Sequence, residues 1–140
     1  MANTLYPLWK HSIMTELETN NSLDQSGVNG CFVALVTTGS GGYVYSDTHQ
    51  FYSSVSGIVG TPAALNNQQL ISNVFKADGL VFTAVTGTTI SALVTYRSNI
   101  GANTTWRLVL YEDTGIVGFP MIPNGGNLLV SWNNQGIFAL

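Results

Sequence analysis

The chain has 140 residues, only 8% of them charged, and a formal net charge of −3. Its basic residues, Lys10, Lys76, Arg97 and Arg107, are scattered, which argues against nucleic acid as a partner because phosphate recognition needs a basic patch. No apolar stretch reaches the roughly 18 residues of a membrane span, and the N-terminus lacks the apolar core of a signal peptide, so we expect no membrane partner and synthesis in a cytoplasm.

The polar part of the chain is mostly neutral. Ser, Thr, Asn and Gln supply 45 of the 140 residues. Charged residues supply only 8%, against roughly 25% in an ordinary soluble domain. When such surfaces meet, few ions have to be desolvated, and hydroxyl and amide groups can pair in many geometries. This composition favours a subunit that packs against other subunits.

The first element is an amphipathic helix, predicted over residues 5–18 and ended by Asn20-Asn21. Apolar side chains recur at every fourth position, as one face of a helix requires; they are Leu5, Trp9, Ile13 and Leu17. Ordering about fourteen residues costs more free energy than burying four side chains returns, so we expect this helix to form only when docked. The sequence leaves open whether it docks on its own sheet or on a neighbouring subunit.

From Cys31 onward the pattern is that of strands, with apolar side chains alternating or in short runs between turns rich in Gly and Asn. The predicted strands are 31–37, 43–46, 58–65, 69–75, 80–85, 89–97, 105–112, 127–132 and 136–140. A single helical turn is expected between Ser46 and Tyr52. We therefore predict an all-β fold, an antiparallel β-sandwich or a partly closed barrel of about 8–9 strands with one short N-terminal helix. Residues 1–27 would hold the helix and a linker, and 28–140 a single β domain.

Two segments are candidates for contact with a partner protein. The N-terminal segment offers Leu5, Tyr6, Leu8 and Trp9 if the helix docks on a neighbour. In the second segment, Pro120 and Pro123 fix an extended loop that cannot complete a ladder of hydrogen bonds, so its apolar side chains either cover a barrel end or insert into a partner. These side chains are Phe119, Met121 and Ile122.

Side chains for chemistry are sparse. Asp47 and His49 share a strand face without a nucleophile, and two histidines and one cysteine match no zinc spacing. Glu112 and Asp113 begin a turn and are expected to be solvated, whereas Cys31 lies in an apolar run and is expected to be buried. We therefore expect no enzyme activity, no cofactor and no metal site.

Short segments over almost the whole chain resemble small structural proteins encoded in the head gene cluster of tailed bacteriophages. They are Asn3-Thr4-Leu5-Tyr6-Pro7-Leu8-Trp9-Lys10, Val33-Ala34-Leu35-Val36, Tyr43-Val44-Tyr45-Ser46, His49-Gln50-Phe51-Tyr52, Val59-Gly60-Thr61-Pro62, Val74-Phe75-Lys76-Ala77-Asp78, Phe82-Thr83-Ala84-Val85-Thr86-Gly87, Ala92-Leu93-Val94-Thr95-Tyr96, Asp113-Thr114-Gly115 and Pro123-Asn124-Gly125-Gly126 leading to Trp132.

The resemblance implies a capsid cement or decoration protein, a β-rich subunit on the outside of the head that clamps neighbouring major capsid proteins. The expected partners are the major capsid protein and further copies of this chain, with a homotrimer favoured over a dimer because closed cyclic oligomers fit capsid symmetry. The expected location is the capsid exterior of the virion. The alternative is a tail or head-fibre adhesion module that binds host surface carbohydrate through exposed aromatic side chains.

Overall fold

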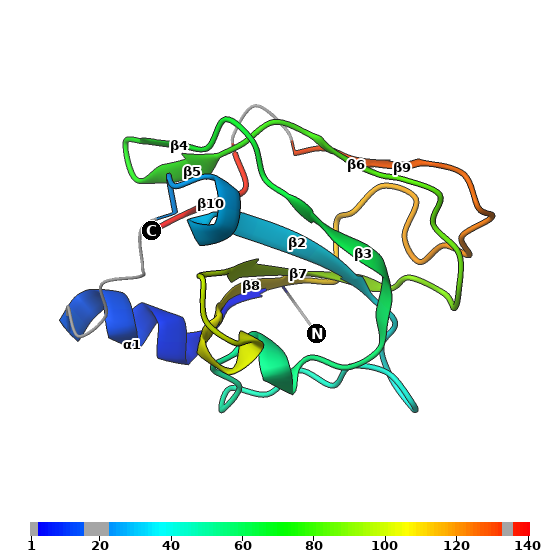
Figure 1. The fold of residues 1–140 in the computed structure, drawn as a ribbon, viewed down its shortest axis with the longest axis horizontal. Coiled ribbons are helices and arrows are strands. Elements are labelled where there is room, and N and C mark those ends of the chain that lie inside the picture. The colour runs from blue at the N-terminus through cyan, green and yellow to red at the C-terminus, as the bar shows by residue number, and fades with distance from the viewer. Residues whose placement is uncertain (1–2, 16–22, 133–135) are drawn as a thin grey trace.

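The computed structural model describes residues 3–15, 23–132 and 136–140 (Figure 1). Over these residues the chain forms ten strands in three antiparallel sheets, together with one α-helix and three short 3₁₀ helices at Gly27–Asn29, Tyr52–Ser54 and Asn103–Thr105. The prediction of an all-β fold with one short helix is confirmed. The sheets are not closed into a barrel, so the sandwich-like alternative is the one that fits.

The largest sheet has five strands, and its three central strands are buried on both faces. All residues of β7 and β8 are buried, and in β2 only Phe32 is partly exposed. Neither face of these strands meets water, which explains why their sequences are nearly continuous apolar runs. The strand order is β1 (Thr4–Leu5), β8 (Arg107–Glu112), β7 (Ala92–Arg97), β2 (Cys31–Val36) and β3 (Ile58–Ala64).

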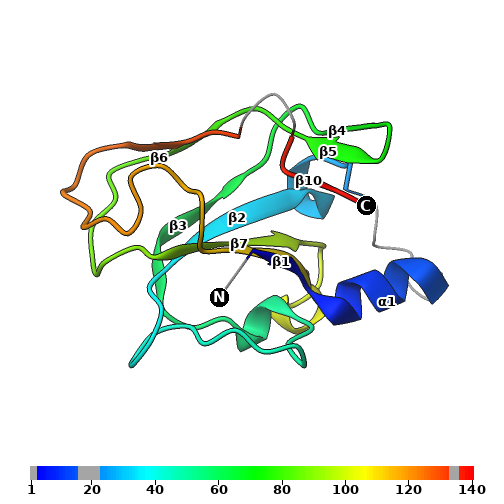
Figure 2. The same ribbon diagram turned by 180° about the vertical axis from the view of Figure 1, so that it is seen from behind.

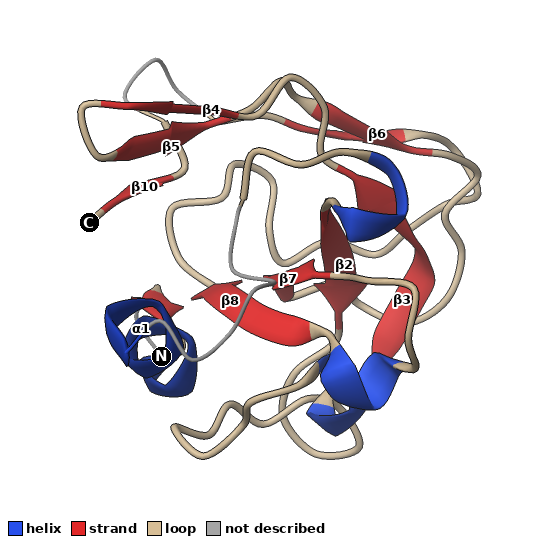
Figure 3. Ribbon diagram, turned by 60° about the vertical axis from the view of Figure 1, so that its left-hand side comes forward, coloured by secondary structure: helices blue, strands red, loops and turns tan. Residues whose placement is uncertain are grey.

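Two small sheets lie on one side of the five-stranded sheet (Figures 1 and 3). One has the order β10-β5-β4, and the other pairs β6 with β9. Buried side chains on their inner faces, such as Phe75, Phe82 and Val130, join the common core. The bounds are β4 (Gln69–Ile71), β5 (Val74–Lys76), β6 (Leu80–Phe82), β9 (Leu128–Val130) and β10 (Phe138–Ala139).

The other side of the five-stranded sheet is covered by a long loop, residues 37–57, rather than by strands (Figure 2). Its aromatic side chains pack on the sheet: Tyr52 stacks on Tyr96 with ring centroids 4.0 Å apart, and Tyr43 lies 6.0 Å from Tyr111. Aromatic rings bury large areas each, so a few of them can take the place of a second sheet.

Several predicted elements differ in detail. Residues 43–46 form no strand, and only a single bridge joins Tyr43 to Thr38. The predicted strand 69–75 is a hairpin of β4 and β5, turned at Ser72 and Asn73, whose φ angles are 50° and 68°. The helical turn expected from Ser46 instead lies at Tyr52–Ser54, because Ser46 and Thr48 bond to each other in a tight turn.

The N-terminal helix docks on the chain's own β domain. Helix α1 spans Pro7–Thr15 and follows β1, which pairs with β8 and so replaces the first helical residues predicted. Trp9 is 2% exposed and lies edge-on to Phe138 of β10, at 5.8 Å between ring centroids. The buried hydroxyl of Tyr6 is 2.7 Å from that of Tyr43, and burial raises its pKa. The end predicted at Asn20-Asn21 falls outside the described residues.

This packing predicts that Trp9 stabilises the fold. Trp9→Ala should lower the free energy of unfolding by about 3–5 kcal/mol, the usual cost of truncating a buried tryptophan. Met14→Ala, on the same helix but at a side chain that is 74% exposed, should change it by less than about 0.5 kcal/mol. Urea denaturation of the two variants makes the comparison. Equal stabilities would show that α1 is not part of the cooperative core.

Candidate functional site

The structure places the N-terminal candidates for partner contact within the fold. Tyr6 and Trp9 are fully buried in the chain's own core, and Leu5 pairs with Leu110 of β8. Leu8 is half-buried. Side chains that fill the chain's own core cannot also cover a partner, so Tyr6 and Trp9 are not exposed for such a contact in this structure.

The three candidates from the second segment, Phe119, Met121 and Ile122, differ in burial. Phe119 and Met121 are half-buried and pack against the core, and the backbones of Met121 and Ile90 exchange two hydrogen bonds of 2.8 and 3.0 Å. Ile122 is 75% exposed. The loop therefore covers the end of the sheets with two of its apolar side chains and leaves one outside.

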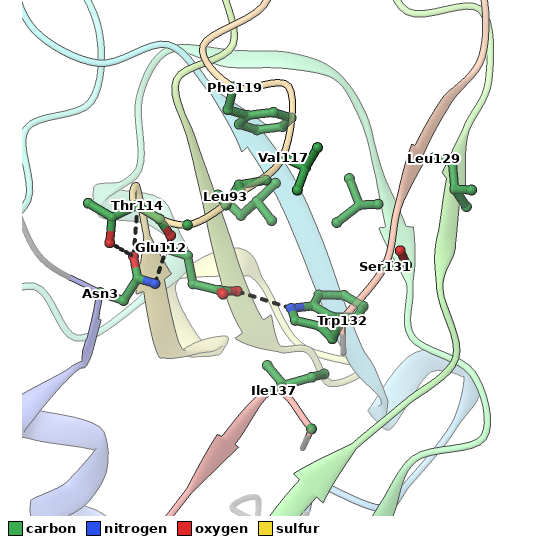
Figure 4. Close-up of a pocket in the computed structure, with 14 residues that line it drawn as sticks. Asn3, Leu93, Glu112, Thr114, Val117, Phe119, Leu129, Ser131, Trp132 and Ile137 are labelled. Carbon is green, nitrogen blue, oxygen red and sulfur yellow. Dashed lines mark hydrogen bonds between the residues drawn. The ribbon is translucent and has the colours of Figure 1, made fainter. Parts of the chain in front are cut away.

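A cavity of about 640 Å³ lies where the three sheets meet, above β7 and β8 and between β9 and the approach to β10 (Figure 4). Its volume is in the range of small-molecule sites. The residues that line it come from the N-terminal stretch, β7, the end of β8, the loop after β8, β9 and the segment before β10. They are Asn3, Leu93, Glu112, Thr114, Gly115, Ile116, Val117, Phe119, Leu129, Val130, Ser131, Trp132, Gly136 and Ile137.

Glu112 is the one titratable side chain among these lining residues. It is 7% exposed, so the expectation of a solvated acidic turn is wrong for this residue. Successive side chains of a strand alternate between faces, which puts Glu112 on the same face as the buried Leu110. That alternation was visible in the sequence and could have identified Glu112 as inward-facing.

The carboxyl group of Glu112 is poorly compensated. One of its oxygens accepts a hydrogen bond of 3.4 Å from the indole N–H of Trp132, at the long end for such a bond. Burial raises the pKa of Glu112 to about 7, and the bond from Trp132 opposes that shift. Near neutral pH the group is therefore divided between its neutral and ionised forms, inside a cavity whose walls are apolar in part and polar in part.

One wall of the cavity is fixed by Asn3. Its side-chain oxygen accepts hydrogen bonds from the backbone N–H groups of Asp113 and Thr114, at 2.8 and 3.0 Å, and its amide donates to the carbonyl oxygen of Thr114 at 3.0 Å. The predicted turn after β8 is present, with Gly115 at φ 71°. The N-terminal stretch thus holds in place the turn that follows Glu112.

Exposed aliphatic side chains adjoin the cavity. Val117 is 99% exposed and Leu129 67%, and both are among the lining residues. Figure 4 shows Val117 over the cavity and Leu129 beside the β9 strand. Val81, the register partner of Leu129 on β6, is 53% exposed. We refer to Val81, Val117 and Leu129 as the apolar margin.

No family model and no curated protein matches this chain. The geometry of the cavity indicates what it can bind. It combines an inward carboxyl group, an indole N–H and aliphatic walls, with exposed aliphatic side chains outside. Such an arrangement suits the binding of a group that carries a hydrogen-bond donor or a positive charge on an apolar stem.

The other candidates for chemistry lie apart from one another. The carboxylate of Asp47 accepts a hydrogen bond from Tyr45 at 2.8 Å, whereas Nδ1 of His49 is 2.9 Å from the hydroxyl of Tyr43. Burial raises the pKa of the Cys31 thiol to about 12, and its expected burial is confirmed.

Within the described residues no group of three metal-binding side chains occurs. None of the helices formed by these residues is long and apolar enough to cross a membrane.

The raised pKa of Glu112 predicts a pH-dependent stability. Between about pH 4.5 and 7 the unfolded chain releases this proton while the folded chain retains it, so the stability of the wild type should fall as the pH rises. The shift corresponds to roughly 3 kcal/mol. Glu112→Gln has no carboxyl group to ionise. Its free energy of unfolding should therefore exceed that of the wild type at pH 8 by up to roughly 3 kcal/mol and equal it at pH 4.

Urea denaturation of both proteins at several pH values measures this difference. If the two stability curves run parallel from pH 4 to pH 8, the carboxyl group does not experience the buried environment described above.

Proposed function

We propose that this chain is a virion structural protein, a capsid cement or decoration subunit that binds the outside of a tailed-bacteriophage head and links neighbouring major capsid proteins. The sequence resemblance motivates the proposal. The all-β fold is compatible with it. So is the scarcity of charge, because a domain with few charged side chains can cover another protein surface at little desolvation cost.

The observation that carries the proposal is the apolar margin. Val117, at 99% exposure, contributes nothing to its own core, and Leu129 and Val81 lie paired on neighbouring strands with most of their side chains in water. Exposed aliphatic groups next to a cavity are typical of protein interaction sites. We infer that this region, rather than the buried N-terminal segment, contacts the major capsid protein.

Binding at many equivalent positions suits modest individual contacts. A subunit that bridges two capsid proteins gains a high effective concentration at the second site once the first is bound. We propose a homotrimer at local three-fold positions as the arrangement that fits capsid symmetry. Sedimentation velocity of the free protein distinguishes this trimer from a dimer or a monomer.

The test is co-sedimentation of the protein with bare, expanded heads of the phage that encodes it. Val117→Asp should weaken binding by at least tenfold, because the new carboxylate would be buried at the contact without a partner. Ile100→Asp is the matched control. Ile100 is 87% exposed and lies at the opposite end of the β7–β8 hairpin from Glu112, so this variant should bind as the wild type does.

Saturable binding that also raises the temperature of head rupture supports the proposal. Equal loss of binding in both variants would place the contact elsewhere. No binding to heads, with recovery of the protein on isolated host envelopes, would contradict cement function and favour the adhesion alternative.

A further inference from the structure

The Glu112 cavity contains a buried acid without a basic partner. Among the described residues that line it, no lysine, arginine or histidine occurs. The four basic residues of the chain lie elsewhere: Lys10 on α1, Lys76 on β5, and Arg97 and Arg107 paired at the far end of β7 and β8. A carboxyl group that is more than nine-tenths buried and meets a single long hydrogen bond is costly to ionise.

We propose that this cavity binds a primary aliphatic ammonium group, with the charge on the Glu112 carboxylate and the alkyl stem along the apolar walls. This site does not depend on the proposed attachment to phage heads. Within the described part of the chain, no side chain fills that role, so the positive charge would come from outside the molecule.

The walls select for an alkyl stem. Leu93 of β7, Ile137 before β10 and Phe119 supply apolar surface on different sides of the carboxyl group, and Val117 lies over the cavity (Figure 4). For a straight chain that leaves water for such walls, each methylene group raises the affinity roughly fourfold. The walls thus bind the stem while the carboxylate binds the charge.

The carboxylate favours an ammonium over a guanidinium group. A guanidinium group binds most strongly when it donates to both carboxylate oxygens at once. In this site the indole N–H of Trp132 takes one acceptor position on one oxygen of Glu112, which leaves fewer positions for a forked donor. An ammonium acts as a point charge and needs only the other oxygen. The indole ring of Trp132 also lines the cavity, and tryptophan is the aromatic side chain that attracts cations best.

Because the cation needs the ionised carboxylate, binding should depend on pH. Leu93 of β7 is the register partner of Glu112, Trp132 in the segment after β9 donates to it, and Asn3 lines the same cavity. None of these three side chains titrates near neutrality. With a pKa of about 7 in the free protein, affinity should be roughly tenfold lower at pH 6 than at pH 8. The ligand keeps its charge throughout this range.

The experiment is isothermal titration calorimetry of the full chain with n-butylammonium chloride at pH 8 and pH 6, with 1-butanol as the neutral ligand of similar shape. We expect saturable binding of the ammonium that weakens about tenfold at pH 6, and butanol binding at least tenfold weaker at pH 8. Glu112→Gln should lose the ammonium binding at both pH values. Asp47→Asn, which removes the same charge on the opposite side of the large sheet, should retain it.

Three results would overturn the proposal: no binding of the ammonium, equal binding of butanol, or wild-type affinity in Glu112→Gln. Folding of each variant is checked by its urea denaturation curve. Because Glu112→Gln is expected to be at least as stable as the wild type, its loss of binding would not reflect unfolding.

A second titration distinguishes the source of the amine. Nα-acetyl-lysine methylamide carries the same ammonium on a peptide backbone. Binding as tight as that of butylammonium would indicate a lysine side chain of a partner protein, and binding of butylammonium alone would indicate a free amine. Neither titration contains phage heads, so failure here leaves cement function untouched, and failure of head binding leaves this site untouched.

Discussion

The structure depends on covering both faces of β8, β7 and β2. Every residue of these strands except Phe32 is buried, and an uncovered face would expose a continuous sheet of Val, Leu and Tyr side chains to water. Two small sheets cover one face, and a loop rich in tyrosine covers the other. Even the first described residues take part, since β1 extends the sheet and Trp9 packs against β10.

The candidate site is the place where this cover is incomplete. The β6–β9 ribbon and the β10-β5-β4 sheet are separate, and the cavity lies between β9 and the approach to β10, with Glu112 on its floor. A leucine there would continue the apolar face to which Leu110 of β8 and Leu93 of β7 belong. Burial at that position raises the pKa of the glutamate, and its ionisation lowers the stability of the fold at neutral pH. A residue that weakens the fold in this way is a candidate for a role in binding.

Much of the fold could be predicted from the sequence because local signals and the final structure agree. Apolar runs located β2, β7 and β8 to within a few residues, and the position of Asn and Gly residues located most turns. The strand predicted at 43–46 failed for a tertiary reason. Tyr43 alternates with Tyr45 as a strand residue would, but these rings serve as a cover over Tyr111 and do not join a sheet.

The site was harder to predict because it depends on residues distant in sequence. Glu112 was interpreted as part of a solvated turn, since its neighbour Asp113 and Gly115 do form one, and only the inward alternation along β8 argued otherwise. The contact between Trp132 and Glu112 joins residues 20 positions apart, which no motif records. Conversely, the sequence leaves open whether Trp9 packs in its own domain or contacts a partner, because an amphipathic helix has the same pattern in both cases.

The central proposal is that the cavity side of the molecule, and not its N-terminal helix, contacts the major capsid protein. Electron cryomicroscopy of decorated heads at side-chain resolution tests this most directly. The account predicts capsid density over Val117 and Leu129 at the mouth of the cavity, with α1 packed on its own sheet. Heads on which α1 has left the β domain to insert between capsid proteins, while the cavity faces solvent, would contradict it.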